Sequence, residues 1–592
     1  MTKNSIQESP TAAPLLRPFD YAGVRITDGR LRDQVEHARA FYLSIPDDNI
    51  LKGFREQAGL PAPGVSMGGW CSNTTEVVFG QWLSGLICLF RATGDAALRE
   101  KAVALMDGWA QAWKTGRLTC NHYSYDKYVG GLVDMAAYGN ATGAIPLLAA
   151  LTDWAEANLK RDRLDATDED SQGGFFNGQL EWYTLPENLY RAYRLTGDER
   201  YRRFAEVWHY PAYWEQFNGN RTPAPHGLHG YSHANALCSA ILAAVVNADA
   251  ELLAAVIRAY DYFQETQCYL TGGYGPGEKL MRPDGTLGES LETEPNEKHL
   301  GGIVGRSFEA PCGTWAGFKI TRYLIEHTGN ARYGDWAERL LYNGIGASLP
   351  PRRSGHSFYY ADYRIGGGVK RYFGDPWPCC SGTYLQDVAE YHNLIYFRDE
   401  SPTAPALYTN LYVPSEVNWE QGGQNVTLTQ RTRYPEAETV EFVIGAERPF
   451  AMTFRFRVPG WSGGITTEVN ALPFAHEERD EWAAVGGVWN GGDRITLRIP
   501  LLLRAVPVDR RYPDRVAFAA GPVVLVRTRE TLSVGTDAGG DALTDAVTPL
   551  GAVAEGASPR FRLHAQSAGV LVPFYSVGQD TPYAMYFDAR DT

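Results

Sequence analysis

Apolar residues recur at helical spacing through more than half of this chain. Leu31, Val35 and Ala38 begin one run with a period of about 3.6 residues, and residues 82–90 contain another. Alanine is abundant in the same region, and strict apolar–polar alternation is scarce there. The pattern therefore predicts helices from about residue 30 to about residue 350.

A short motif marks the places where one helical pattern ends and the next begins. Its three copies are Gly94-Asp95, Gly197-Asp198 and Gly329-Asn330. Glycine suits the position just after a helix, and Asp or Asn suits the N-cap of the next one. Recurrent helical hairpins over such a length predict a toroid or solenoid of paired helices, whose closed form is an (α/α) barrel.

The pattern changes after about residue 400, where apolar and polar residues alternate. Residues 453–458 have a period of two and run into the turn Pro459-Gly460-Trp461. Residues 493–500 and 516–526 have the same strand character. We therefore predict one or two β-sandwich modules after the helices, which makes the chain a multidomain α+β protein.

The length of the chain agrees with several domains. At 592 residues it is too long for one compact core, and two or three domains are expected. The predicted division is a loose tail over residues 1–20, a helical barrel over 21–400 and β-sandwich modules over 401–592.

The net charge bears on the class of partner. The formal charge is −14 and the isoelectric point is near 5.4, whereas nucleic acid is bound by a clustered basic surface. No stretch approaches the roughly 20 apolar residues that cross a bilayer. We expect neither a nucleic-acid partner nor a membrane. The oligomeric state stays open, with a homodimer as one option.

The first residues and the cysteines indicate a compartment. Residues 1–10 are polar and lack the apolar core of a signal peptide. Eight cysteines in 592 residues are too sparse for a disulfide scaffold, which favours free or metal-bound thiols in a reducing environment. We expect the protein to be cytoplasmic.

Aromatic residues are abundant. The chain has 15 Trp, 34 Tyr and 24 Phe, together 12% of its residues. Aromatic faces stack on the apolar faces of sugar rings, and Tyr and Trp add polar groups. Carbohydrate binding and a large aromatic core are both compatible with this composition.

Three cysteines and one carboxylate are the strongest candidates for chemistry. Cys379 and Cys380 are adjacent and lie between a proline and Ser-Gly, a context typical of a tight turn. Adjacent thiols do not readily bridge each other, but both can reach one metal ion. With Cys312 and Glu309 they offer the tetrahedral, thiolate-rich set that Zn²⁺ favours, although three unrelated free cysteines are the alternative. The other cysteines each stand alone and are expected to be buried structural thiols: Cys71, Cys88, Cys120, Cys238 and Cys268.

Two glutamates are candidates for acid/base chemistry. Hydrolysis of a glycoside needs a proton donor on one side of the anomeric carbon and a nucleophile or base on the other. Glu278 ends the glycine-rich run 271–277, and Glu289 follows in Gly288-Glu289-Ser290. The glycine run lacks the strand and helix context of a phosphate-binding loop, so we do not expect a nucleotide there.

Polar and aromatic residues gather at three predicted helix starts. A toroid would line its pocket from such positions, and together these residues predict a pocket for a polyol. The candidate substrate-binding residues are His122 and Lys127, Glu181 and Trp182, and His229 and His233.

These motifs follow one order along the chain. The glycine run comes first, then Glu309 to Cys312, residues 332–335, residues 341–344, the cysteine pair and residues 456–462. In this order the chain resembles the β-L-arabinofuranosidases of glycoside hydrolase family 127 and their DUF1680 relatives. The resemblance extends over roughly residues 20–530, and the paired cysteines are its most specific element.

The resemblance implies a fold, a metal and a reaction. It implies an (α/α)₆ barrel followed by β-sandwich domains, with Zn²⁺ held by Glu309, Cys312, Cys379 and Cys380. Cys379 would also be the nucleophile of a retaining exo-hydrolysis that releases β-linked L-arabinofuranose through a thioglycosyl intermediate. A glutamate would protonate the leaving oxygen and then activate water, and Glu278 is favoured over Glu289 because it directly follows the matching glycine turn.

The chain departs from the family at one ligand. The usual spacing is Glu-x-Cys, whereas here Ala310 and Pro311 separate Glu309 from Cys312. Two other functions remain compatible with the sequence. One is a sugar epimerase or lyase on an (α/α) toroid, which would use His or Tyr and need no cysteine. The other is a non-catalytic carbohydrate-binding protein with a structural zinc.

Overall fold

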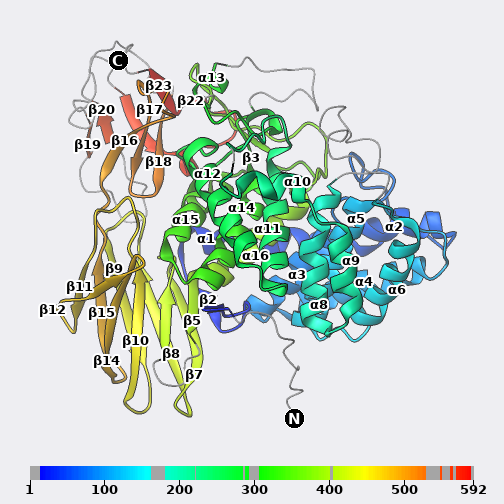
Figure 1. The fold of residues 1–592 in the computed structure, drawn as a ribbon, viewed down its shortest axis with the longest axis horizontal. Helices are drawn as coiled ribbons and strands as arrows, with labels where there is room; N and C mark the ends of the chain where they lie inside the picture. The colour runs from blue at the N-terminus through cyan, green and yellow to red at the C-terminus, as the bar shows by residue number, and fades with distance from the viewer. Residues whose placement is uncertain are drawn as a thin grey trace.

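The computed structural model describes residues 14–161, 181–220, 222–284, 287–292, 306–399, 405–528, 547–549, 561–563 and 569–588. Helices fill the N-terminal part of the chain and strands the C-terminal part, and Figure 1 shows the two parts side by side. The multidomain α+β class is therefore confirmed. The division at residue 400 stays a prediction.

Within the described residues, six helices form a closed inner ring. Each packs on the next, and the last packs back on the first. In ring order they are α3 (Phe79–Thr93), α5 (His122–Gly139), α8 (Leu185–Thr196), α11 (Gly230–Val246), α14 (Ala310–Thr328) and α16 (Cys380–Ile395).

An outer helix packs against each member of the ring. In the same order as the inner ring they are α4 (Ala96–Trp113), α6 (Ala144–Asn158), α9 (Glu199–Val207), α12 (Ala250–Thr266), α15 (Gly334–Asn343) and α1 (Gly29–Ser44). Alternating inner and outer helices make the (α/α)₆ barrel that the sequence led us to expect.

The predicted hairpin turns join inner helices to outer segments. Gly94 has φ +73° at the end of α3, and the Asp95 side chain caps α4. Gly197 and Asp198 do the same between α8 and α9. The third copy ends α14 and caps the short helix before α15. The glycines adopt the left-handed conformation without a Cβ penalty, which confirms these turns.

Burial separates the two rings. Every residue of α11 and of α16 is buried, whereas α9 buries only Tyr201, Phe204 and Ala205. A helix that is apolar all round belongs inside a structure, and an amphipathic one belongs at its surface. Polar residues on the inner helices are therefore enclosed by the barrel.

The inner helices α3 and α5 approach each other closely. A Cβ on Gly80 of α3 would lie 2.1 Å from the carbonyl oxygen of Lys127, and one on Gly131 of α5 would lie 2.5 Å from the carbonyl oxygen of Gly80. Only glycine at these two positions lets the backbones meet. This contact sets the position of Lys127 in the barrel.

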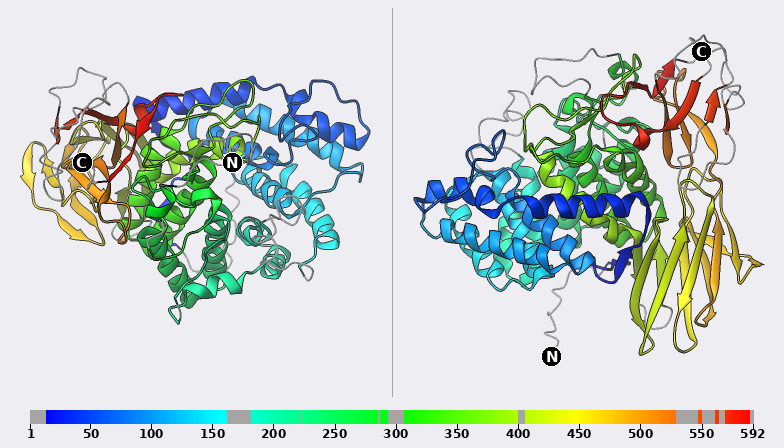
Figure 2. Two further views of the ribbon diagram at one scale, coloured as in Figure 1. Left: turned by 90° about the horizontal axis from the view of Figure 1, so that it is seen from above. Right: turned by 180° about the vertical axis from the view of Figure 1, so that it is seen from behind.

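Two sheets form a β-sandwich beside the barrel, and Figure 2 shows them along one side of the helices in both further views. In spatial order, the first is β1 (Arg17–Pro18), β5 (Tyr396–Asp399), β6 (Ala406–Thr409), β10 (Phe450–Arg457), β14 (Trp482–Trp489) and β13 (Glu477–Arg479). The second is β12 (Leu472–Phe474), β11 (Thr466–Val469), β15 (Arg494–Arg498), β9 (Thr439–Gly445), β8 (Gln424–Thr432), β7 (Ser415–Gln421) and β2 (Val24–Ile26). Phe442 of β9 meets Phe456 of β10 at 4.8 Å between ring centroids, so the sheets share a core.

A third sheet follows. In spatial order its strands are β16 (Leu503–Pro507), β17 (Arg515–Ala520), β18 (Val523–Thr528), β21 (Gly569–Pro573), β20 (Phe561–Leu563) and β19 (Val547–Pro549), while β22 (Tyr583–Ala584) pairs with β18 and β23 (Tyr586–Asp588) with β17. The remaining helix of full length is α2 (Asp47–Ala58), which packs on α4. The other described elements are short: α10 (Pro211–Trp214), α13 (Leu287–Ser290), β3 (Phe308–Glu309), β4 (Tyr360–Ala361), η2 (Trp182–Thr184), η3 (Glu215–Phe217), η4 (Pro276–Glu278), η5 (Ala331–Tyr333), η6 (Ile345–Ala347) and η8 (Phe574–Ser576).

A buried ionic cluster joins the barrel to the sandwich. Arg457 of β10 is fully buried, and its guanidinium pairs with Glu338 of α15 at 2.7 Å and with Asp335. Trp461 donates to Glu338 at 3.0 Å, and Asp335 accepts from the backbone of Gly460 at 2.9 Å. Two motifs of the sequence, at 332–335 and 456–462, therefore contribute to one domain contact.

No helix among the described residues is both long enough and apolar enough to span a bilayer.

Candidate active site

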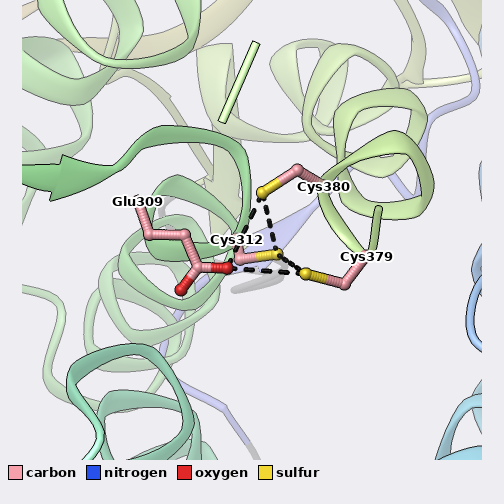
Figure 3. Close-up of side chains that lie close together, drawn as sticks. All are labelled: Glu309, Cys312, Cys379 and Cys380. Carbon is pink, nitrogen blue, oxygen red and sulfur yellow. Dashed lines mark hydrogen bonds between the residues drawn. The ribbon is translucent and has the colours of Figure 1, made fainter. Parts of the chain in front are cut away.

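Three thiols and one carboxylate meet at the inside of the barrel (Figure 3). Cys312 Sγ lies 3.4 Å from Cys380 Sγ and 3.6 Å from Cys379 Sγ. Glu309 Oε1 lies 3.6 Å from both Cys379 and Cys380. The four predicted ligands are thus brought together, although Cys312 lies 67 positions before Cys379 in the chain.

Local structure explains how these side chains are positioned. Cys379 is the N-cap of α16 and Cys380 is its first residue. Glu309 is the N-cap of α14, and Pro311 in the first turn fixes the backbone that leads to Cys312. Because the helix begins at Ala310, the extra residue between Glu309 and Cys312 is part of that first turn, and both side chains still face the same group.

The inner helices direct their N-terminal ends toward the site. His122 begins α5, Glu181 precedes η2 and α8, and His229 is the N-cap of α11. The N-termini of α14 and α16 carry the thiols. A helix N-terminus bears a partial positive charge, so several of them together favour thiolates and carboxylates.

The carboxyl of Glu309 and the three thiols are buried, and they affect one another's pKa values. Burial raises the pKa of Glu309, Cys312 and Cys380 above their ordinary values. The pKa of Cys379 is instead lowered, because Cys312 and Cys380 donate hydrogen bonds to its sulfur. Cys379 is 8% exposed, while the other two thiols have no exposed surface. One thiol of the three is therefore both accessible and disposed to ionise.

The donor set fits a metal ion. Among the described residues, this is the group of His, Cys, Asp and Glu whose ligand atoms all lie within 4.8 Å of one another. Glu309 Oε2 has no hydrogen-bond partner in the described structure, although it is buried. Several buried acids without a Lys or Arg partner are costly unless a cation compensates them. The group could therefore hold a metal that prefers sulfur.

Glu278 faces this group from the glycine-rich turn. It ends η4 with φ +65°, and its carboxylate accepts a hydrogen bond from the Tyr360 hydroxyl. Burial raises its pKa. Glu278 Oε2 also lies 3.9 Å from His229 Nε2. The glycine turn thus brings one predicted carboxylate to the thiols.

Glu289 lies elsewhere. It is on α13, its side chain is 38% exposed, and it pairs with Arg511 at 2.6 Å and with Arg282 at 3.8 Å. Both of its partners are half exposed arginines, one of them in the β region. The structure does not bring Glu289 to the thiols.

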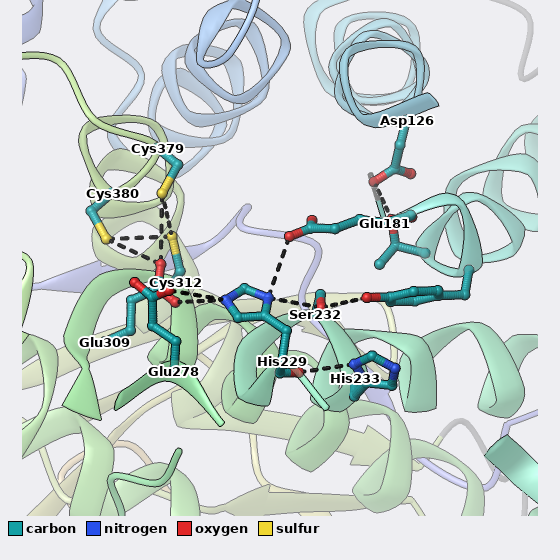
Figure 4. Close-up of polar contacts among 12 residues, drawn as sticks. Asp126, Glu181, His229, Ser232, His233, Glu278, Glu309, Cys312, Cys379 and Cys380 are labelled. Atoms are coloured by element: carbon teal, nitrogen blue, oxygen red, sulfur yellow. Dashed lines mark hydrogen bonds and ion pairs between the residues drawn. The ribbon is translucent and has the colours of Figure 1, made fainter. Parts of the chain in front are cut away.

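His229 lies at the centre of the polar contacts (Figure 4). Its Nδ1 lies 2.9 Å from Ser232 Oγ and 3.6 Å from Glu181 Oε1. Its Nε2 lies 3.7 Å from Glu309 Oε2. Burial lowers the pKa of His229 to about 4, so the ring is neutral at pH 7 and can exchange hydrogen bonds with its carboxylate neighbours.

Lys127 contributes the buried cation of this region. Its ammonium pairs with Asp126 at 3.2 Å, and its side chain is 7% exposed. It also lies 4.6 Å from the centre of the Tyr123 ring. The carboxylate of Asp126 accepts further hydrogen bonds from Thr184 and Asn188, so the pair is held in place.

The other predicted substrate-binding residues lie in aromatic surroundings. His122 stacks edge-on with Trp208 at 5.0 Å. His233 is fully buried, and its ring lies 4.4 Å from Tyr183 and 5.0 Å from Tyr213. Trp182 is likewise fully buried and meets Tyr183 at 5.4 Å. Figure 4 shows His233 on the side of His229 away from the thiols.

Two tyrosines at the site were missed from the sequence. Tyr359 places its hydroxyl 3.5 Å from Cys379 Sγ, and Tyr360 donates to Glu278. They reach the site because β4 pairs with β3 and sets Tyr360 opposite Glu309. Two-residue strands leave no periodic signal, so only the aromatic run 358–360 could have drawn attention to them.

The comparisons with known proteins agree on one family. A family model described as the β-L-arabinofuranosidase GH127 catalytic domain matches residues 102–393, and the GH127 middle domain matches residues 406–501. Together these two models of one family cover more than half of the chain. In sequence, no curated protein matches it.

Solved structures share the fold over almost the whole chain. A GH127 β-arabinofuranosidase superposes with a TM-score of 0.73 at 16% identity, covering 97% of this chain and 98% of that one. A GH127 β-L-arabinofuranosidase from Geobacillus stearothermophilus T6 has a TM-score of 0.68 at 16% identity, covering 95% and 99%. A protein described as a glycoside hydrolase has a TM-score of 0.70 at 15% identity, covering 98% of both chains. With the barrel, the sandwich and both domain models in agreement, the chain belongs to the β-L-arabinofuranosidase family GH127 and is a glycoside hydrolase.

Proposed function

We propose that this glycoside hydrolase is a retaining exo-enzyme that releases a β-linked furanose, with L-arabinofuranose as the favoured sugar and Cys379 as the nucleophile. One observation carries the proposal. Of the three clustered thiols, Cys379 is the one with exposed surface and the one whose pKa is lowered by its neighbours. A nucleophilic thiol needs both access to the substrate and thiolate character.

We propose that Glu309, Cys312, Cys379 and Cys380 hold Zn²⁺. The sulfur–sulfur distances of 3.4 and 3.6 Å are close to the edge of a tetrahedron, which is about 3.8 Å for Zn–S bonds of about 2.3 Å. When bound, Zn²⁺ supplies positive charge that keeps its thiolate ligands deprotonated at neutral pH.

In the first step, the Cys379 sulfur attacks the anomeric carbon with its lone pair. The bond between that carbon and the glycosidic oxygen breaks, and Glu278 gives its proton to the leaving oxygen. The product is a thioglycosyl group on Cys379. Burial raises the pKa of Glu278, which favours the protonated carboxyl that this step requires.

In the second step, the Glu278 carboxylate takes a proton from water. The water oxygen attacks the anomeric carbon, the carbon–sulfur bond breaks, and Cys379 leaves as a thiolate. Two displacements at one carbon retain its configuration. The hydrogen bond from Tyr360 to Glu278 orients the carboxylate for both proton transfers.

We propose that Lys127, Glu181 and His229 bind the hydroxyls of the terminal sugar. Their polar atoms are buried beside the thiols and are held by partners of their own, Lys127 by Asp126 and His229 by Ser232. A neutral imidazole can donate to one hydroxyl or accept from another, and a carboxylate accepts two. A pocket enclosed in this way favours the end of a glycan chain.

The test is a Cys379→Ser variant assayed on p-nitrophenyl β-L-arabinofuranoside, α-L-arabinofuranoside, β-D-xyloside and β-D-galactoside. We expect hydrolysis of the first substrate, and a loss of kcat of at least about 10³-fold in the variant. The matched control is Cys268→Ser, since Cys268 has a similar exposed fraction of 9%. Rapid quenching of the unmodified enzyme followed by peptide mass spectrometry should find one pentosyl unit on the peptide that contains Cys379. Turnover that survives Cys379→Ser would contradict the mechanism.

A further inference from the structure

A cavity whose lining does not include the thiols lies along the inner helices of the barrel. Its volume is about 400 Å³. Residues of the inner helices α5, α8, α14 and α16 line it, together with residues between Pro14 and Tyr21. The catalytic group lies at the first residues of α14 and α16, whereas this cavity reaches Glu326 on α14 and Asn393 on α16. The cavity therefore extends along these helices away from the thiols, to the last turns of α14 and α16.

Most of the charged side chains that line this cavity are paired. Arg191 pairs with Asp134, and Lys319 pairs with Glu187. Arg322 pairs with Glu326 at 2.6 Å and also with Glu390. Planar guanidinium and carboxylate groups fixed in this way offer donors and acceptors with little loss of side-chain entropy. Five cationic and four carboxylate side chains line the cavity, so its net charge is small and it does not select a strongly charged ligand.

An aromatic face completes the lining. Trp315 is half buried on α14, and the Lys319 ammonium lies 5.3 Å from the centre of its ring. Asn393 also lines the cavity and is 2% exposed, yet its Oδ1 has no hydrogen-bond partner in the described structure. A buried amide oxygen without a partner is costly, and a hydroxyl of a ligand would satisfy it.

We propose that this cavity is a second, non-catalytic binding site for a neutral mono- or disaccharide. Sugar hydroxyls donate to carboxylates and accept from guanidinium groups, and the apolar face of the ring stacks on an indole. A volume of about 400 Å³ is within the range of small-molecule pockets. The proposal goes beyond hydrolysis and does not depend on which glycoside the thiol site cleaves.

A chain of hydrogen bonds leads from this cavity toward the catalytic pocket. Arg191 donates to Asn188 at 2.9 Å, and Asn188 donates to Asp126 at 2.8 Å. Asp126 is the partner of Lys127. A sugar that contacts Arg191 would thus lie two residues, Asn188 and Asp126, away from Lys127.

The test uses ¹⁹F NMR of the full chain carrying Cys379→Ser and labelled with 5-fluorotryptophan. Trp315→Phe, Trp154→Phe and Trp70→Phe each remove one resonance and so assign it. Trp70 reports on the catalytic side, since its ring lies 6.4 Å from that of Tyr359. Trp154 is the matched control on the outer helix α6, where it packs on Trp113. The probes are L-arabinose, D-xylose and D-galactose.

We expect the Trp315 resonance to shift saturably with at least one sugar, with a dissociation constant different from that of the Trp70 shift, while Trp154 stays unchanged. Asn393→Leu should weaken the Trp315 titration about five- to tenfold and leave the Trp70 constant within twofold. Two results would overturn the proposal. One is a Trp315 resonance that moves with none of the three sugars. The other is a Trp315 titration whose dissociation constant equals that of the Trp70 titration, both with and without Asn393→Leu. Binding at the catalytic site alone would then explain both shifts.

Discussion

The two ends of the barrel are both polar and both buried, but they differ in how charge is balanced. At the thiol end, Glu309 and three cysteines form no ion pair with Lys or Arg among the described residues. At the other end, Arg191, Lys319 and Arg322 each pair with a carboxylate. Buried acids that pair with no Lys or Arg call for a bound cation, whereas a set of small net charge is suited to a neutral ligand. The same ring of helices thus supports two kinds of chemistry.

Removal of a metal should have the largest effect on activity, and it should affect only the thiol end of the barrel. Dialysis against a chelator should abolish hydrolysis, because Glu309, Cys312 and Cys380 would no longer be held as metal ligands around Cys379. Metal analysis together with the activity assay measures this. Cys380→Ser should bind less metal than the unaltered protein, while Cys88→Ser should bind the same amount. Full activity in metal-free protein would contradict the assignment of the thiol end.

Glu278→Gln should have the next largest effect. Glutamine cannot exchange a proton, so kcat/KM should fall by about 10²- to 10⁴-fold on a natural glycoside, whose leaving oxygen needs a proton. The loss should be smaller with p-nitrophenyl substrates in the first step, because that leaving group is stable as an anion. The control is Glu289→Gln, which should keep activity within twofold. Equal losses in both variants would show that the choice between the two glutamates is wrong.

The third prediction concerns Lys319→Met, which removes one of the paired cations that line the cavity. It leaves the Glu187 carboxylate buried at 1% exposure without its cation, and breaking such a pair costs about 3–5 kcal/mol of unfolding free energy. Denaturant unfolding measures the change. The double variant Lys319→Met, Glu187→Gln should recover much of the loss because no charge is then left alone. If Lys319→Met alone is as stable as the unaltered protein, water already solvates the Glu187 carboxylate.

The smallest predicted effect concerns His392, which lies next to Asn393 on α16. Burial lowers its pKa to about 4, below the ordinary value of 6.5. As the pH falls from 6.5 toward 4, the unfolded chain therefore binds a proton before the folded one does, and stability is lost by at most about 3 kcal/mol. His392→Gln should flatten the pH dependence of unfolding in this window. The control for the substitution itself is His226→Gln, at an exposed histidine.

Different parts of the molecule were predictable to different degrees. The turns at Gly94-Asp95 and Gly197-Asp198 were predicted because a helix stop and a helix cap depend on neighbouring residues. The set of Glu309 and the three cysteines was predicted because its chemistry is rare enough to stand out in a sequence. Tyr359 and Tyr360 were missed because two-residue strands bring them to the site, and no periodicity announces such strands.

By itself, the sequence determined the order of helices and strands, the hairpins that pair them and the types of residue available for chemistry. These follow from local periodicity, capping and composition, which act over a few residues. Only the tertiary structure decided that Glu278 rather than Glu289 faces the thiols, that Arg457 joins two domains, and that a cavity lies along the inner helices. These depend on contacts between residues far apart in the chain, where the closing of the ring, and not the local pattern, sets the distances.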